Sequence, residues 1–328
     1  MKFGSKSIRS KSIIGLDMDS KEIRAVELKG SKKKPTVTAW GRINLPEGVV
    51  KDGRIIQLDK FSDQLSQFLL ENSFKTRDVI LGVNNQDVII RFASFPKVPE
   101  DKIKSMIKFQ AQDYIPIPLE EMELDYIILG EKNTEVGQYI DVVLVAARKR
   151  MLNDFILTFT DARLTINEID TTMLALGRAA LSQSSGGVFA LVCFNYDIGN
   201  ILIFKDTILG MARSVSISQS LNMPLLKDIH NKKNMEIIAD ILFNEIKASV
   251  SYYKSQTGYD IDKIFVLGPD SNQRLVASRL KDTTGLAVKV PEPYKYLEKH
   301  VLKQQKNMTF KATDYVASIS LALRGLEV

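Results

Sequence analysis

The sequence predicts an α/β fold of two lobes, and three observations carry this prediction. Strand-like apolar runs cluster at residues 13–43 and again at 188–217, and each cluster reads as strand, polar turn, strand, turn, strand. Helical patterns follow each cluster, and a glycine- and serine-rich break at 182–187 separates the two halves. This weak internal repeat implies two similar lobes that face each other across a cleft, which is a natural ligand site.

The first half of the chain carries predicted strands, helices and a subdomain of its own. In order, the predicted elements are two strands within 13–28, a strand at 36–43, a helix around 61–69, a hairpin of strands 79–83 and 88–92, a helix from Glu100, strands at 125–129 and 140–147, and a helix around 151–159. The helix from Glu100 carries Ile103, Met106 and Ile107 on one face. We expect that face to cover a small sheet.

The second half repeats the opening pattern. The predicted elements are strands at 188–194, 201–204 and 208–217, a long helix at about 235–256, a strand at 264–267 and a C-terminal helix at 315–323. Gly15 to Asp19 superposes on Leu191 to Asn195 without a gap. This alignment predicts that Asn195 occupies, in the second lobe, the turn position that Asp19 occupies in the first.

Composition narrows the function. The chain has 328 residues, 45% of them hydrophobic, which is enough for two packed lobes. The net charge of +6 permits an acidic partner but does not indicate nucleic acid. A single cysteine, Cys193, argues against a disulfide framework or a cysteine metal site, and two histidines leave little for metal chemistry. No run approaches the roughly 18 apolar residues of a membrane span, so we expect a cytoplasmic protein without a metal site.

Several motifs resemble the PilM family, the actin-like proteins of type IV pilus assembly. They are Gly15-Leu16-Asp17 with Val26-Glu27-Leu28, the run Leu45 to Gly53, Phe95 to Pro99 followed by Gln110 to Pro118, and Leu321 to Gly325. Each motif is weak alone, but their order and spacing are specific and span nearly the whole chain. The resemblance implies an actin-like (ribonuclease H-like) two-lobed α/β fold. It places the first lobe at 1–43 and 151–185, a small inserted α/β subdomain at 44–150, and the second lobe at 186–328.

The resemblance also implies a function. It places ATP in the cleft, and it implies a groove that takes the short cytoplasmic tail of PilN, an inner-membrane pilus protein. The chain would then lie at the cytoplasmic face of the inner membrane, peripheral to it. Contact with pilus motor ATPases is left open.

The nucleotide motifs depart from the family pattern at three places. The first loop, Asp17-Met18-Asp19-Ser20, has aspartate where the family has glycine. The second loop, Cys193-Phe194-Asn195, has lost both the acid and the glycine, and the adenosine motif is Gly268-Pro269. The sequence therefore changes all three contacts that the resemblance assigns to the nucleotide.

Each change acts against a bound phosphate. Two unit charges 4 Å apart repel by about 4 kcal/mol at an effective dielectric constant of 20, so Asp19 disfavours a phosphate unless Mg²⁺ screens it. The Asn195 side chain occupies space that a phosphate needs, and Pro269 has no N–H. A second register stays open, in which the literal Asp197-Ile198-Gly199 forms the loop after a longer strand.

We therefore expect a PilM-like scaffold that docks a PilN-like tail without ATP and has no catalytic residue. The alternative is a PilM-like protein that binds ATP through a reshaped cleft, with slow or no hydrolysis. A third class, a sugar or acetate kinase of the same superfamily, would need a catalytic carboxylate in a cleft loop, and the sequence carries no such signature.

The tail-binding groove is expected between the first lobe and the inserted subdomain. Candidate contacts are Arg91, Phe92 and Phe95, because two aromatic residues beside an arginine suit a peptide with apolar anchors. The alternative is that Phe92 and Phe95 belong to the core of the subdomain.

Overall fold

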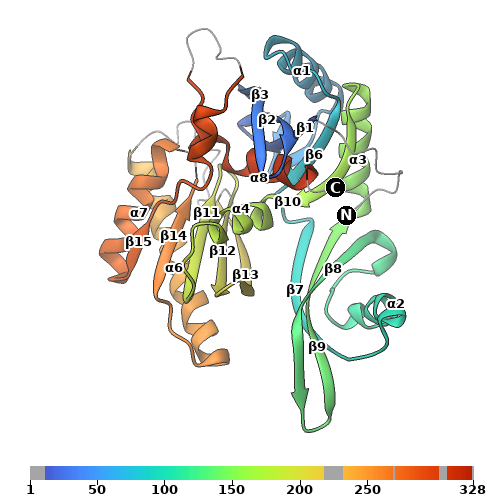
Figure 1. Ribbon diagram of the computed structural model, residues 1–328, viewed down its shortest axis with the longest axis vertical. Helices are drawn as coiled ribbons and strands as arrows, with labels where there is room; N and C mark the ends of the chain where they lie inside the picture. Colours follow the sequence, from blue (N-terminus) through green and yellow to red (C-terminus); the bar gives the residue numbers. More distant parts are fainter. Residues whose placement is uncertain (1–11, 218–231, 269, 303–308, 327–328) are drawn as a thin grey trace.

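The computed structural model describes residues 12–217, 232–268, 270–302 and 309–326. Figure 1 shows two large sheets side by side and a smaller sheet that projects below them. The first-lobe sheet has the order β10-β6-β1-β2-β3, with β1 (Ser12–Met18), β2 (Glu22–Ser31), β3 (Lys34–Asn44), β6 (Asp78–Val83) and β10 (Thr165–Thr171). The second-lobe sheet has the order β13-β12-β11-β14-β15, with β11 (Val188–Phe194), β12 (Ile198–Lys205), β13 (Ile208–Ser216), β14 (Lys263–Leu267) and β15 (Ala287–Lys289).

The two large sheets have the same topology. In each, three antiparallel strands form a meander, and two parallel strands extend the sheet beyond its first strand. The helices repeat as well: α1 (Leu58–Glu71) and α3 (Lys149–Asp161) correspond to α6 (Lys232–Thr257) and α7 (Asp270–Thr284). The predicted internal repeat and the two-lobed α/β fold are confirmed. Smaller elements are β4 (Val50–Lys51), β5 (Arg54–Ile55), and the 3₁₀ helices η3 (Lys295–Lys299) and η4 (Ala312–Tyr315).

The last helix of each lobe packs on the sheet of the other lobe. Helix α8 (Val316–Gly325) lies so close to β1 that a Cβ atom at Gly15 would stand 1.9 Å from the carbonyl oxygen of Ser318. Helix α4 (Thr172–Leu181) approaches β12, where a Cβ at Gly177 would stand 3.0 Å from the ring of Phe204. Through these two helices, α4 and α8, the lobes share one apolar core.

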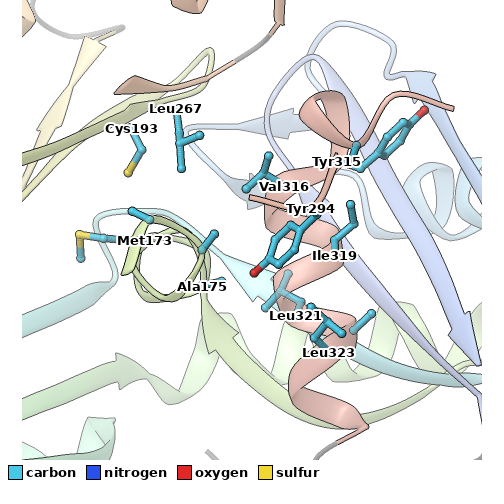
Figure 2. Packing of buried hydrophobic residues seen from close by; sticks show 14 of the residues in the cluster. Met173, Ala175, Cys193, Leu267, Tyr294, Tyr315, Val316, Ile319, Leu321 and Leu323 are labelled. Atoms are coloured by element: carbon cyan, nitrogen blue, oxygen red, sulfur yellow. The ribbon is translucent and has the colours of Figure 1, made fainter. Parts of the chain in front are cut away.

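Figure 2 shows this core at the place where α4 and α8 meet. Ala175 on α4 points toward Leu321 on α8, and Met173 of α4, Leu323 of α8 and Cys193 of β11 belong to the same cluster. The Ser320 hydroxyl donates to the carbonyl oxygen of Ala175 at 2.6 Å, which links the two helices directly. The expected assignment of 186–328 to the second lobe alone is therefore corrected, because α8 packs on β1 of the first-lobe sheet.

The inserted subdomain is a three-stranded sheet with one covering helix. Its sheet has the order β7-β9-β8, with β7 (Val88–Pro96), β8 (Met122–Thr134) and β9 (Gly137–Arg148). Helix α2 (Glu100–Gln110) and the 3₁₀ helices η1 (Ala111–Asp113) and η2 (Leu119–Glu121) connect β7 to β8. Ile107 of α2 packs with Phe95 and Val142, so α2 covers one face of the sheet as expected.

The insert is shorter than the predicted range of 44–150. Strand β6 lies in the middle of the first-lobe sheet and pairs in parallel with β1 and β10, so the predicted hairpin of 79–83 with 88–92 is wrong. Nearly every residue of β6 is buried, as is typical of a parallel strand with cover on both faces. The chain therefore leaves the first lobe only after β6 and returns to it at α3.

Candidate functional site

The two turns that face the interlobe cleft are built in the same way. In the first lobe, Asp19 Oδ1 accepts from the amides of Lys21 at 2.9 Å and Glu22 at 3.0 Å. In the second, Asn195 Oδ1 accepts from the amides two and three residues later, at 2.9 and 2.8 Å. The gap-free alignment of Asp19 with Asn195 is thus confirmed. The alternative register is wrong, because Ile198 and Gly199 lie in β12 and not in the turn.

A pair of hydrogen bonds joins the two turns across the cleft. The backbone amide of Ser20 donates to Asp197 Oδ2 at 2.8 Å, and the Ser20 hydroxyl donates to Asp197 Oδ1. Burial raises the pKa of Asp197, although the two hydrogen bonds from Ser20 lower it. The partners are 177 residues apart in the chain, so this contact fixes one lobe against the other. We call it the clasp.

Arg24 of β2 places a guanidinium inside the cleft, where three carboxylates surround it. Its nitrogens lie 2.5 Å from Asp19, 3.2 Å from Glu22 and 4.0 Å from Asp17. Burial raises the pKa of Asp19 to about 7, against the opposing effect of Arg24. Burial also raises the pKa of Asp17, whose carboxylate accepts from the Thr172 hydroxyl at 2.8 Å. One guanidinium thus faces three acidic side chains inside the cleft, so Arg24 is fully engaged by acids of its own lobe.

The space that remains in the cleft is about 40 Å³, lined among others by Asp17, Arg24, Asn195 and Gly268. That volume is close to the share of one water molecule, whereas a nucleotide needs several hundred Å³. The ring of Phe194 covers Gly268, since a Cβ atom there would lie 2.6 Å from it. The space in the cleft, as the two lobes lie here, is therefore much smaller than a nucleotide.

The expected nucleotide-site residues divide into three groups. Asp17, Asp19, Ser20, Asn195 and Gly268 lie around the cleft or in its two turns. Cys193 is buried in the core, and burial raises the pKa of its thiol to about 12. Pro269 lies outside the described residues. Arg24 was not identified as a cleft residue from the sequence. Its signal in the sequence was its position as a basic residue between the apolar Ile23 and Ala25 of a strand.

A separate groove of about 350 Å³ lies where the two lobes and the insert meet. One wall is the face of the insert sheet that α2 leaves open, with Ile127, Leu129, Val143 and Val145. The other walls come from β10 and α4 of the first lobe and from the β12–β13 turn of the second. Their residues include Thr171, Leu174, Gly177, Leu181, Phe204, Thr207 and Leu209. The groove is mostly apolar and is shared by all three parts of the molecule.

An ion-pair network borders one side of the apolar groove. Arg178 lies 2.6 Å from Asp170, and Arg324 lies 3.5 Å from the same carboxylate. Arg324 Nε also donates to Glu168 at 2.7 Å. These pairs hold polar residues of β10 in place beside the groove and leave the charges locally balanced.

The residues expected to contact a peptide lie elsewhere. Phe95 is 1% exposed and packs edge-on against Tyr114 in the core of the insert, so its prediction as a groove residue is wrong. Arg91 is exposed and does not line the groove. Phe92 lines a neighbouring hollow of about 590 Å³ that shares Leu129 and Leu209 with the groove. The sequence signal for the groove was Ile127-Ile128, two isoleucines on opposite faces of β8.

A third hollow, of about 1060 Å³, lies on the other side of the junction between the first lobe and the insert. It is polar. Asp87 binds Arg54 at 2.6 Å and Arg148 at 3.1 Å within it, and Ile56 lies on its rim. Among the described residues, no group of three or more histidine, cysteine or acidic side chains is arranged to hold a metal ion.

Comparison with known proteins gives a family and a fold. The family model described as type IV pilus assembly protein PilM matches residues 15–201, more than half of the chain. A solved structure of the "PilM-PilN type IV pilus biogenesis complex" is similar with a TM-score of 0.81 and 22% identity, over 98% of this chain and 100% of that one. The ethanolamine utilization protein EutJ from Carboxydothermus hydrogenoformans is similar with a TM-score of 0.53 and 12% identity, over 96% and 90%. In the part of the chain that the structure describes, no helix is both long and apolar enough to cross a membrane.

Proposed function

The chain belongs to the PilM family of type IV pilus assembly proteins and has its actin-like fold, and from this premise we propose a scaffold that works without ATP. It docks the cytoplasmic tail of a PilN-like inner-membrane protein. The solved relative is a PilM–PilN complex, which supports the choice of partner. Because such a partner is itself anchored in the membrane, docking would hold this chain at the cytoplasmic face.

The apolar groove is the observation that carries the proposal. It is lined by β8 and β10, each of which is the last strand of its sheet. Edge strands offer main-chain donors and acceptors to an extended segment, and alternate side chains of that segment can enter apolar pockets. Ile127 is 45% exposed, so this wall has apolar surface that a bound chain would cover. These features suit an extended peptide with apolar anchors.

The closed cleft supports the ATP-free part of the proposal. The amides of both turns donate to Asp19, Asn195 and Asp197, and the Arg24 side chain is surrounded by acids. A phosphate would have to displace these contacts and would meet three carboxylates. The scaffold is therefore proposed as non-catalytic, with binding as its activity.

The test is the binding of a peptide of about twelve residues, taken from the cytoplasmic tail of the cognate PilN-like protein and labelled for fluorescence anisotropy. Extended, such a peptide spans roughly 40 Å, enough to cross the groove. Ile127→Glu puts a carboxylate on the apolar wall, and we expect it to weaken binding at least about tenfold. No binding to the folded wild-type chain at high micromolar peptide would overturn the proposal.

Two matched controls locate the site. Ile128 is also 45% exposed and is the next residue of β8, but it pairs across to Val142 on the opposite face of the sheet. Ile128→Glu should bind the peptide as wild type does. Ile56→Glu changes the rim of the polar hollow and should also leave binding intact. If Ile56→Glu loses peptide binding and Ile127→Glu does not, the peptide binds in the polar hollow and not in the apolar groove.

A further inference from the structure

Strand β12 connects the clasp to the apolar groove. Its first residue, Ile198, follows Asp197, and its last residues lead through Phe204 to Thr207 and Leu209 in the groove wall. The strand has eight residues, about 26 Å long, and all but the last are buried. Strand β12 is buried and pairs with a strand on each side, so a displacement of one end is transmitted to the other.

The Asp197 side chain serves the contact between lobes rather than its own turn. Asn195 holds the turn through the amides of Asp197 and Ile198. Asp197 is 1% exposed, and its carboxylate accepts from the amide and the hydroxyl of Ser20. A hydrogen bond from the backbone of Gly53 also lowers the pKa of Asp197. Ser20 and Gly53 both belong to the first lobe. The buried carboxylate is thus satisfied only when the lobes are closed.

Other contacts between the lobes leave a role for the clasp. The packing of Gly177 against Phe204 and Leu202 is apolar, and apolar contacts have little directional preference. Asn200 Nδ2 donates to Asn84 Oδ1 at 3.3 Å, a long bond near the clasp. At the far edge of the first-lobe sheet, Val37 pairs through its backbone with residues 300 and 302. The α4 contact can therefore act as a pivot, and the clasp restrains rotation about it.

We propose that Asp197 is a positioning residue for peptide binding: through the clasp and β12 it holds Phe204 and Leu209 at the spacing from the insert sheet that the groove requires. This inference rests on the proposed function for its ligand. The clasp takes the place between the two turns where the family resemblance puts nucleotide phosphates.

The experiment measures lobe closure and peptide binding in the same variants. Spin labels at Leu70→Cys on α1 and Tyr252→Cys on α6 report the distance between lobes, since both positions are exposed. The native thiol, Cys193, is buried and resists labelling. In Asp197→Ala we expect a broader distance distribution and about tenfold weaker binding of the tail peptide. Asp197→Asn keeps one acceptor oxygen and should be intermediate in both.

Asp262→Ala is the matched control. Asp262 accepts from the amide of Val188 at 2.7 Å, a contact inside the second lobe. This variant should lose stability without a change in lobe distance or in the Kd of the peptide. A wild-type distance distribution in both Asp197 variants, or a wild-type Kd, would overturn the clasp inference. Failure of the wild-type chain to bind peptide would overturn the proposed function instead, since the distance measurement needs no peptide.

Discussion

Asn195 in the second lobe stands where Asp19 stands in the first, and each side chain holds its turn by accepting the amides two and three residues later. The backbone amide of each also donates to the carbonyl three residues on, at 3.1 and 3.0 Å. In a phosphate-binding turn such amides would face the anion. Here the Asp19 and Asn195 side chains accept from these amides in place of an anion. The amides of both turns therefore have hydrogen-bond partners without a ligand.

The first prediction is that Mg-ATP does not stabilise the wild-type chain. A ligand at 100 times its Kd raises the free energy of unfolding by about 2.7 kcal/mol. Because the cleft holds about 40 Å³ and its turn amides are occupied, we expect no shift in Tm with millimolar Mg-ATP. The measurement is a thermal melt, with a nucleotide-binding actin-fold protein as positive control. A saturable rise in Tm would favour the ATP-binding alternative.

The second prediction concerns pH. The pKa of Asp19 is raised from 3.8 to about 7, so between these values the folded state binds more protons than the unfolded state. The free energy of unfolding should therefore fall as pH rises from about 4 to 7, by up to about 4 kcal/mol from this group. Asp17 and Asp197 have raised pKa values and act with the same sign.

Asp19→Asn tests this pH dependence by chemical denaturation. Asparagine can hold the turn, as Asn195 does in the second lobe, but it does not titrate. We expect the variant to show a flatter profile between pH 4 and 7 than wild type. Asp63→Asn, at an exposed position of α1, should keep the wild-type profile. Identical slopes in wild type and Asp19→Asn would contradict the prediction.

The third prediction tests the packing of α8 on the first-lobe sheet. A Cβ atom at Gly15 would stand 1.9 Å from the Ser318 carbonyl oxygen and 2.5 Å from the Ala322 nitrogen, both backbone atoms. Gly15→Ala should therefore cost about 3 kcal/mol or more in the free energy of unfolding. Gly130→Ala is the control, since a Cβ there has nothing within 4 Å. Equal stability of the two variants would mean that α8 does not lie on β1 as described.

The fourth prediction separates core from binding surface within the insert. Phe95→Ala empties a site in the core under α2 and should cost about 3–5 kcal/mol. Phe109, on the outer face of α2, is 82% exposed, and Phe109→Ala should change stability by less than about 0.5 kcal/mol. Urea denaturation measures both. A small effect of Phe95→Ala on stability, together with weaker peptide binding, would restore Phe95 as a contact residue.

Some strands and helices escaped prediction because distant residues stabilise them. Strand β10 reads TINEIDT, and its acids obscure the strand pattern. Arg324 and Arg178, from α8 and α4, pair with Glu168 and Asp170 and make those acids acceptable there. Helix α4 is buried on nearly all sides, so it lacks the apolar stripe by which a surface helix is found.

The sequence by itself determined the repeat, the family and the register of the two turns. These depend on local properties: the order of strands and turns, and the preference of Asp19 and Asn195 for turns in which their side chains accept nearby amides. For the same reason the loss of the glycines was visible without a structure. Patterns within a few residues are enough to establish each of these points.

Only the tertiary structure decided which side chains fill the cleft and where the apolar groove lies. Alternation along β7 and β8 separates two faces but does not say which face α2 covers, so Phe95 and Ile127 could not be told apart. The contact of Ser20 with Asp197 joins residues 177 positions apart, and Arg24 meets its acids only once β1 and β2 pair. Packing and pairing between distant segments depend on the whole chain, because a buried polar group such as the Asp197 carboxylate finds its partner on a distant segment.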